Sequence, residues 1–77
     1  MKELLVYIAR NLVSEPDAVT VDEKQLDDDN IVLELRVAPQ DMGKVIGRQG
    51  KIAREIRTLV KSVAQRSGKK VSVEIVD

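Results

Sequence analysis

The chain is 77 residues long, enough for one domain with a small core. It contains no cysteine, no histidine and a single aromatic residue, Tyr7. These absences exclude disulfides, zinc sites built on Cys or His, thiolate nucleophiles and imidazole acid-base chemistry. We therefore expect a single domain over residues 1–77 that has no cofactor, no metal and no enzymatic activity.

Positive charge is concentrated in the second half of the chain, although the formal net charge is zero. Residues 1–37 hold four basic residues against nine acidic ones, and residues 38–77 hold nine against four. Between residues 43 and 70, nine Lys or Arg stand against Glu55 alone. Such a field attracts polyanions. By itself it leaves nucleic-acid binding and a merely solvated helix face equally open.

The start of the chain differs from both a membrane span and a signal peptide. No apolar run approaches the roughly 18 residues that a membrane helix needs. Glu3 and Arg10 interrupt the first apolar stretch. Since no cysteine suggests an oxidising compartment, we expect a cytoplasmic protein without membrane contact.

Periodicity predicts a helix over residues 1–13, ended by the proline at position 16. Residues 18–26 and 31–38 alternate between apolar and polar side chains, which is typical of half-buried strands. In the first of these, Val19 and Val21 share the apolar face. The polar run 27–30 predicts a turn, so we expect the two strands to form an antiparallel hairpin.

The second half is predicted to contain two helices and a strand. Residues 40–46 suit one or two helical turns, which Gly47-Arg48-Gln49-Gly50 then interrupts. Helical spacing over 51–66, a glycine cap at position 68 and alternation over 71–75 predict a long helix and a last strand. The order helix-strand-strand-helix-helix-strand predicts an α+β fold with three helices on one face of a three-stranded sheet.

The segment Gly47-Arg48-Gln49-Gly50 is the strongest candidate for a binding site. Its two glycines leave the backbone unshielded, and the following helix directs free N–H groups and its positive dipole end at an approaching anion. Lys44, Arg48 and Lys51 add formal charge. Dinucleotide-binding and P-loop patterns do not fit, because both need glycine at position 45, which is valine. A bare G-x-x-G also suits a solvated turn between helices.

Residues 45–56, Val-Ile-Gly-Arg-Gln-Gly-Lys-Ile-Ala-Arg-Glu-Ile, resemble the signature of the KH domain. That signature is an apolar pair, G-x-x-G and a helix with apolar repeats, and its loop clamps four backbone nucleotides of RNA. The extra helix and strand before the core resemble the prokaryotic type II arrangement. Because the likeness covers essentially all 77 residues, the chain is most similar to small stand-alone bacterial KH proteins.

This resemblance implies a non-catalytic protein that binds single-stranded RNA. The two glycines would bring the backbone against phosphates, the two residues between them would contact that backbone, and the cations would extend the charge. The neighbouring apolar residues belong either to a groove for the bases or to the core; they are Val45, Ile46 and some of Ile52, Ala53 and Ile56. The residues assigned to RNA binding are Lys44, Ile46, Gly47, Arg48, Gln49, Gly50, Lys51 and Arg54.

The resemblance also implies partners and a cellular role. It suggests self-association to a homodimer, pairing with a second KH-containing protein, and action as an RNA chaperone in post-transcriptional regulation, with effects on cell elongation and envelope growth. The alternative is a protein-interaction or assembly module with little RNA role of its own.

Overall fold

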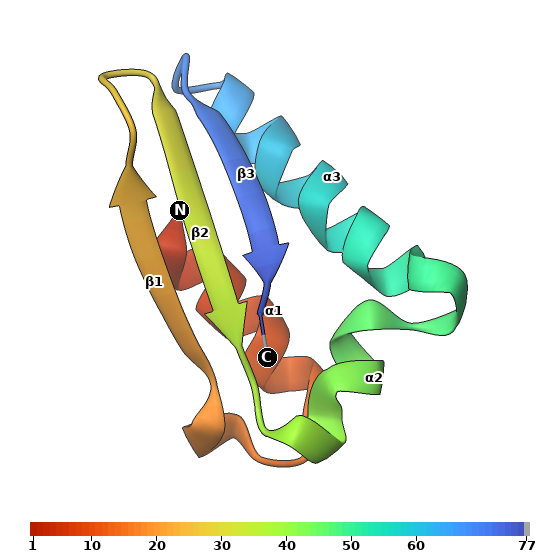
Figure 1. The fold of residues 1–77 in the computed structure, drawn as a ribbon. Coiled ribbons are helices and arrows are strands. Elements are labelled where there is room, and N and C mark those ends of the chain that lie inside the picture. Colours follow the sequence, from red (N-terminus) through yellow and green to blue (C-terminus); the bar gives the residue numbers. More distant parts are fainter. Residues whose placement is uncertain (77) are drawn as a thin grey trace.

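The computed structural model describes residues 1–76, and its elements follow the predicted order (Figure 1). Short 3₁₀ turns at Pro16–Ala18, Pro39–Asp41 and Arg48–Gly50 connect some of the main elements. Within this part of the chain, no helix is long and apolar enough to span a bilayer. The helices and strands are α1 (Lys2–Leu12), β1 (Thr20–Gln25), β2 (Asn30–Arg36), α2 (Met42–Ile46), α3 (Lys51–Gln65) and β3 (Lys70–Ile75).

The three strands form one mixed sheet in the order β1-β2-β3. β1 and β2 pair antiparallel, which confirms the predicted hairpin, and β2 and β3 pair parallel. Parallel neighbours need a long crossover connection, and residues 37–69 supply it. β2 is therefore the central strand, whereas β1 and β3 each have a free edge.

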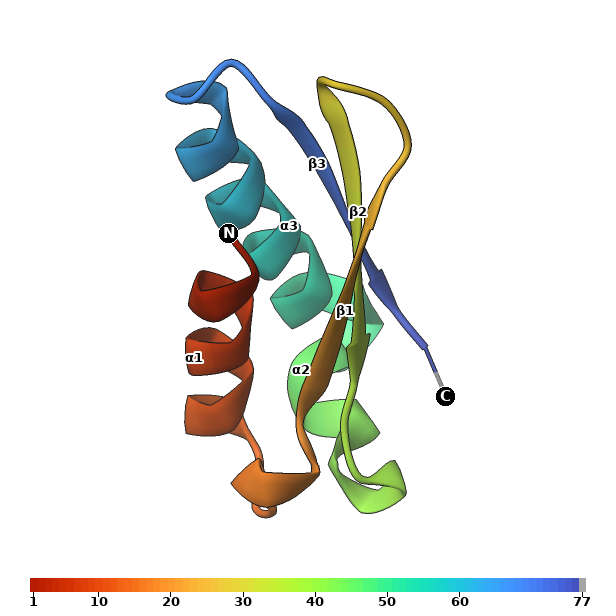
Figure 2. The same ribbon diagram turned by 90° about the vertical axis from the view of Figure 1, so that its left-hand side faces the viewer.

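The helices cover one face of the sheet, as predicted (Figure 2). α1 packs against β1, and α3 packs against β3. On the opposite, uncovered face, polar side chains pair across the strands. Lys24 lies 3.3 Å from Glu34, and Arg36 lies 2.8 Å from Asp22.

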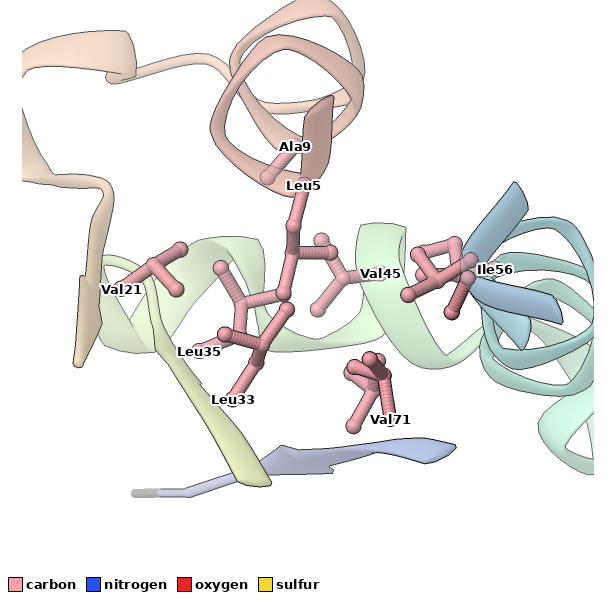
Figure 3. Close-up of a cluster of buried hydrophobic side chains, with 11 residues drawn as sticks. Leu5, Ala9, Val21, Leu33, Leu35, Val45, Ile56 and Val71 are labelled. Atoms are coloured by element: carbon pink, nitrogen blue, oxygen red, sulfur yellow. The ribbon is translucent and has the colours of Figure 1, made fainter. Parts of the chain in front are cut away.

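Aliphatic side chains from both layers form the core (Figure 3). Alternate strand residues point inward, and α3 contributes one stripe at helical spacing, so each element buries a single face. Burial of each Leu, Ile or Val contributes about 1.5 to 3 kcal/mol. The core residues are Leu5, Ala9, Val21, Leu33, Leu35, Val45, Ile56, Val60, Ala64, Val71 and Val73.

The element boundaries differ from the predicted ones by one or two residues in most cases. Val19 precedes the first strand instead of lying within it, because the 3₁₀ turn Pro16–Ala18 occupies the chain just before. The predicted helical segment 40–46 divides in two, since Pro39 starts a separate 3₁₀ turn and α2 begins only at Met42. Gly68, at φ 72°, closes α3 as expected.

Candidate nucleic-acid interface

The loop 47–50 links α2 to α3 through an uncommon backbone path. Gly47 has φ 76° and ψ 176°, a region that essentially only glycine occupies. Gln49 has φ 56° and ψ 26°, which is sterically costly for a residue with a Cβ atom, and Gly50 has φ 75°. These three residues all have positive φ, and together they turn the chain sharply from α2 into α3.

The two glycines meet different surroundings. A Cβ atom on Gly47 would lie 2.6 Å from Cγ1 of Ile52, so the bare backbone here lets α2 pack against the first turn of α3. A Cβ atom on Gly50 would meet nothing within 4 Å. Gly47 is therefore required for packing, whereas Gly50 keeps the outer surface of the loop bare.

Helix α3 begins at Lys51, whose amide donates to the carbonyl of Arg48 in the preceding 3₁₀ turn. No side chain caps its N-terminus, and its first turn contains no acidic residue. No side chain therefore offers a hydrogen-bond acceptor to the N–H groups that follow Lys51 in the first turn, and no nearby carboxylate offsets the positive end of the helix dipole. In α1, by contrast, Glu3 lies in the first turn. The start of α3 is suited to an anion.

The cations around the loop fall into two groups. Arg48, Lys51 and Arg54 are exposed, and none has a carboxylate partner within 4 Å in residues 1–76. Lys44 differs, because its Nζ lies 3.4 Å from the carboxylate of Asp41 and also donates to the Ser14 hydroxyl. Three of the four predicted cations are thus available to a ligand, and the fourth is engaged within the protein.

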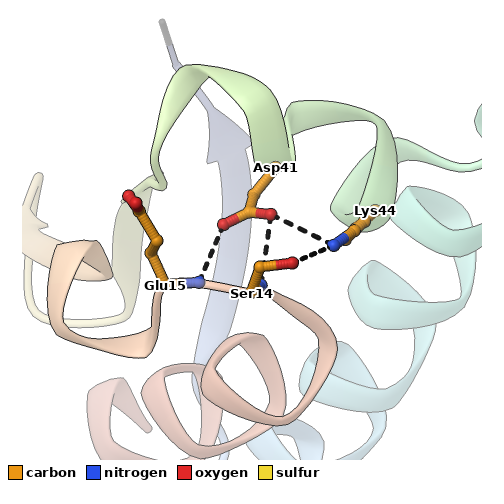
Figure 4. A network of polar contacts seen from close by, with 4 residues as sticks. All are labelled: Ser14, Glu15, Asp41 and Lys44. Atoms are coloured by element: carbon orange, nitrogen blue, oxygen red, sulfur yellow. Dashed lines mark hydrogen bonds and ion pairs between the residues drawn. The ribbon is translucent and has the colours of Figure 1, made fainter.

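Asp41 is a fully buried carboxylate that the sequence did not single out. One of its oxygens accepts a hydrogen bond from the amide of Ser14 and the other from the amide of Glu15, both at 3.1 Å (Figure 4). Burial acts to raise the pKa of Asp41, but these two amides and the Lys44 ammonium together hold that pKa below the usual 3.8. Asp41 thereby ties the exit of α1 to the start of α2, which leads into the loop.

The apolar residues beside the loop belong mainly to the core. Val45, Ala53 and Ile56 are at most 5% exposed, so of the two roles left open by the sequence we assign them to packing. Ile46 is half-buried and packs at the margin of the core. It is the one apolar member of the predicted set, and it keeps some surface next to Gly47.

Sequence spacing missed an exposed leucine on α3. Leu59 falls at a helical core position but is 47% exposed, and with Lys51 and Arg54 it lines a shallow depression on the outer side of the helix. A second depression lies between α1 and α3 and includes Leu12, Ile52 and Leu59. Periodicity could not reveal this exposure, because it depends on how far α1 extends over α3.

Comparison with known proteins gives a family match over nearly the whole chain. The family model described as "KhpA/KhpB, KH domain" matches residues 2–75. The protein named RNA-binding protein KhpA from Clostridium perfringens is 55% identical over 76 residues, which covers 99% of this chain and 100% of that protein. The one from Chlamydia trachomatis is 48% identical over 77 residues, which covers 100% of this chain and 97% of its own.

Two solved structures share the fold. A variant of Aquifex aeolicus Era bound to GDP and AlF4⁻ superposes with a TM-score of 0.69 at 20% identity. Era in complex with MgGDPNP and a segment of 16S ribosomal RNA gives 0.59, also at 20% identity. Each match covers 96% of this chain and 28% of the Era chain. At this identity the likeness concerns the fold alone.

Proposed function

The chain belongs to the KhpA/KhpB family of KH domains and has the type II KH fold, and from this membership we propose that it is a non-catalytic protein that binds single-stranded RNA. Relatives that are 55% and 48% identical are named RNA-binding proteins, and the matches cover 100% and 97% of their length. The loop 47–50 is the proposed grip on the RNA backbone.

One observation carries this proposal: a helix start without a side-chain cap and cations without a carboxylate partner meet at the same loop. The start of α3 has neither a side-chain cap nor an acidic residue in its first turn. Arg48, Lys51 and Arg54 have no carboxylate partner among the described residues. A sugar-phosphate chain supplies the acceptors and the negative charge that this loop lacks.

Each predicted residue then has a distinct task. Gly50 lets a phosphate approach the protein backbone. Arg48 and Gln49 contact the RNA from the exposed side of the loop. Lys51 and Arg54 extend the positive surface along α3. Gly47 allows the loop to pack closely against Ile52. Ile46 offers apolar surface to a base. Lys44 contributes the part of its charge that Asp41 does not offset.

The affinity of one such module should be modest and should depend on salt. If three or four cations contact phosphates, the slope of log K against log salt is about −2 to −3 for a single strand. A second module raises the effective concentration of the site. We therefore propose that the protein acts as a homodimer or together with a KhpB-like partner, as a cytoplasmic RNA chaperone in post-transcriptional regulation that affects cell elongation and envelope growth.

A second candidate function is a protein-interaction module with little RNA role of its own. The exposed apolar residues Leu12 and Leu59, beside the depression between α1 and α3, favour it. It predicts a stoichiometric complex that resists both salt and nuclease.

The decisive experiment reverses charge within the loop. Replacement of Arg48 and Gln49 together by Asp should leave the fold intact, because both side chains are exposed and make no ion pair. Binding to a short single-stranded RNA, followed by fluorescence anisotropy at several salt concentrations, should be lost.

The matched control replaces Gln65 and Arg66 by Asp. This pair has the same two residue types, is also exposed, and lies at the opposite end of α3. The control should keep most of its binding. A loop variant that binds with the affinity and salt slope of the unmodified protein would refute the assignment of the loop.

A further inference from the structure

Asp41 anchors α2 at the end that lies away from the loop 47–50. It immediately precedes this helix, and its side chain is completely buried. Its two carboxylate oxygens accept hydrogen bonds from two consecutive amides, those of Ser14 and Glu15, just beyond the end of α1. The position of this carboxylate is therefore fixed, because any displacement would break a charge-assisted hydrogen bond of a buried group.

Helix α2 depends on such anchors for its orientation. It comprises only Met42–Ile46, and isolated helices shorter than about 12 residues are marginal in water. Val45 enters the core, and Gly47 packs against Ile52. Both of these contacts lie toward the end of the helix that leads into the loop. Asp41 fixes the opposite end.

Lys44 adds a second connection between α2 and the exit of α1. It lies one helical turn after Asp41, and its Nζ lies 3.4 Å from Oδ1 of that residue and also donates to the Ser14 hydroxyl (Figure 4). Two side chains one turn apart thus hold the same short segment. Such a contact restricts both the tilt of α2 and its rotation about its own axis.

The loop is close enough to this anchor to be moved by it. Gly47 lies six positions after Asp41, which corresponds to about 9 Å of helix, so a tilt of about 10° at the anchored end moves the loop by about 1.5 Å. Binding groups need to stay within about 0.5 Å of their productive positions. A loosened α2 would therefore misplace the loop backbone and Arg48 together.

We propose, building on the proposed RNA-binding function, that Asp41 is a positioning residue that holds the loop 47–50 in the orientation that grips the sugar-phosphate backbone. Its complete burial leaves no surface for RNA, so it acts through α2. This role opposes the effect of its charge, because a carboxylate near a phosphate-binding surface weakens the attraction for RNA. The exit of α1 thereby belongs to the binding machinery.

The test replaces Asp41 by Asn. This variant keeps the shape of the side chain and one oxygen acceptor, but it removes the charge and presents an amino group to the second backbone amide. Affinity for a short oligouridine, measured by fluorescence anisotropy, should fall roughly threefold to thirtyfold. If Asp41 served only to offset Lys44, the affinity would instead rise, because the substitution would release that cation to the RNA.

Two controls separate positioning from charge and from stability. Glu55→Gln removes an exposed acidic residue that makes no ion pair within residues 1–76, and it should bind RNA more tightly. Val21→Ala removes part of a buried side chain of β1, and it should lower stability without changing affinity. Urea unfolding of every variant measures the stability and establishes that the protein is folded under the binding conditions.

Amide chemical shifts report the position of the loop without RNA. In Asp41→Asn, the resonances of Ser14 and Glu15 should move because their acceptor changes, and those of Gly47 and Gly50 should move with the loop. Val21→Ala should leave the two glycine resonances in place.

Ser14→Ala is a milder substitution of the same connection, and it decides the question if Asp41→Asn does not fold. Ser14 is exposed, and its hydroxyl is an acceptor for Lys44. The variant should move the glycine resonances of the loop and lower the affinity roughly twofold. Unmoved resonances with unchanged affinity would then overturn the positioning role.

The outcomes distinguish this inference from the function on which it rests. A folded Asp41→Asn variant that binds RNA at least as tightly as the unmodified protein overturns the positioning role and leaves the loop assignment standing. Equal weakening in Val21→Ala overturns it too, because lost stability would then explain the effect. If the unmodified protein binds no RNA, the proposed function fails, and the glycine resonances still decide whether Asp41 holds the loop.

Discussion

Two tight turns of this molecule carry polar and charged side chains. In the hairpin turn 27–30 these side chains form hydrogen bonds with one another and with the backbone, whereas in the loop 47–50 they form none with residues 1–76. In the hairpin turn, the carboxylate of Asp27 accepts hydrogen bonds from the amides of Asp29 and Asn30, each at 2.9 Å, and from the Asn30 side chain. In the loop 47–50, the structure gives no side-chain hydrogen bond to Arg48 or Gln49 within residues 1–76.

The contrast shows that charge density alone does not identify a binding site. In the acidic turn, the polar groups form hydrogen bonds with one another. In addition, the Lys69 ammonium donates to the carbonyl of Asp28, and the amide of Lys70 donates to the carbonyl of Asp29. In the basic loop, by contrast, the side chains of Arg48 and Gln49 have no hydrogen-bond partner in residues 1–76. A site is better recognised by polar groups without partners than by the number of charges.

Gly47→Ala should have the largest effect, because it damages the loop from its core side. The substitution places a side chain in a glycine-only conformation and forces a contact with Ile52, at a cost of about 3 kcal/mol. Urea unfolding measures the loss. The matched control Gly43→Ala lies within α2 with open space around it, and should stabilise the protein by about 0.5 to 1 kcal/mol. Equal effects at the two glycines would contradict the packing role of Gly47.

Asp27→Ala should open the hairpin turn and lower the melting temperature without weakening RNA binding. Hydrogen bonds, first from the Asp29 amide and then from Asn30, hold the pKa of Asp27 below 3.8. A carboxylate whose pKa is lowered by folding stabilises the protein above its unfolded pKa, and this contribution disappears as the pH falls through the folded value. The difference in melting temperature between the variant and the unmodified protein should therefore be largest near neutral pH and should decrease below pH 3.8.

The control for this turn is Asp28→Ala, since the Asp28 side chain makes no hydrogen bond or ion pair with the residues that the structure describes. A series of melting curves against pH checks both variants. If Asp28→Ala lowered the melting temperature as much as Asp27→Ala, the turn would not depend on the Asp27 hydrogen bonds.

Gly50→Ala should lower RNA affinity while it costs the protein little stability. A left-handed alanine costs about 1 kcal/mol, and no protein atom lies within 4 Å of the added methyl group. The methyl group would instead face an approaching phosphate, so RNA affinity should fall although the protein stays folded. Unchanged affinity in an anisotropy titration would exclude a close approach of RNA at Gly50.

Gln49→Gly should have the smallest effect on stability, and a favourable one. Glycine relieves the left-handed strain at this position but gains freedom in the unfolded chain, so we expect a net gain of about 0.5 kcal/mol. Denaturant unfolding of the variant beside the unmodified protein measures it. A loss of stability would show that the Gln49 side chain contributes contacts in the folded loop.

Local sequence pattern was sufficient to predict the helices and strands. It was not sufficient to predict the hydrogen bonds between residues that lie far apart in the sequence. Helical spacing over 51–66 and strand alternation over 31–38 depend on neighbours in sequence, and the structure places α3 and β2 there within two residues. Asp41 could not be predicted, because its amide partners lie 26 and 27 residues earlier in the chain. The same holds for Arg57, whose Nε donates to the carbonyl of Val73, 16 residues further on.

The parallel pairing of β2 with β3 has a consequence during protein synthesis. Val71 and Val73 of β3 complete the layer on which α3 rests, and β3 is the last strand that a ribosome would release. A nascent chain that ends before residue 70 lacks the strand against which α3 packs, although α1 and α2 also contact α3, and the loop 47–50 is then held less firmly. We therefore expect newly made chains to ignore RNA, including their own message, until translation of the domain is nearly finished.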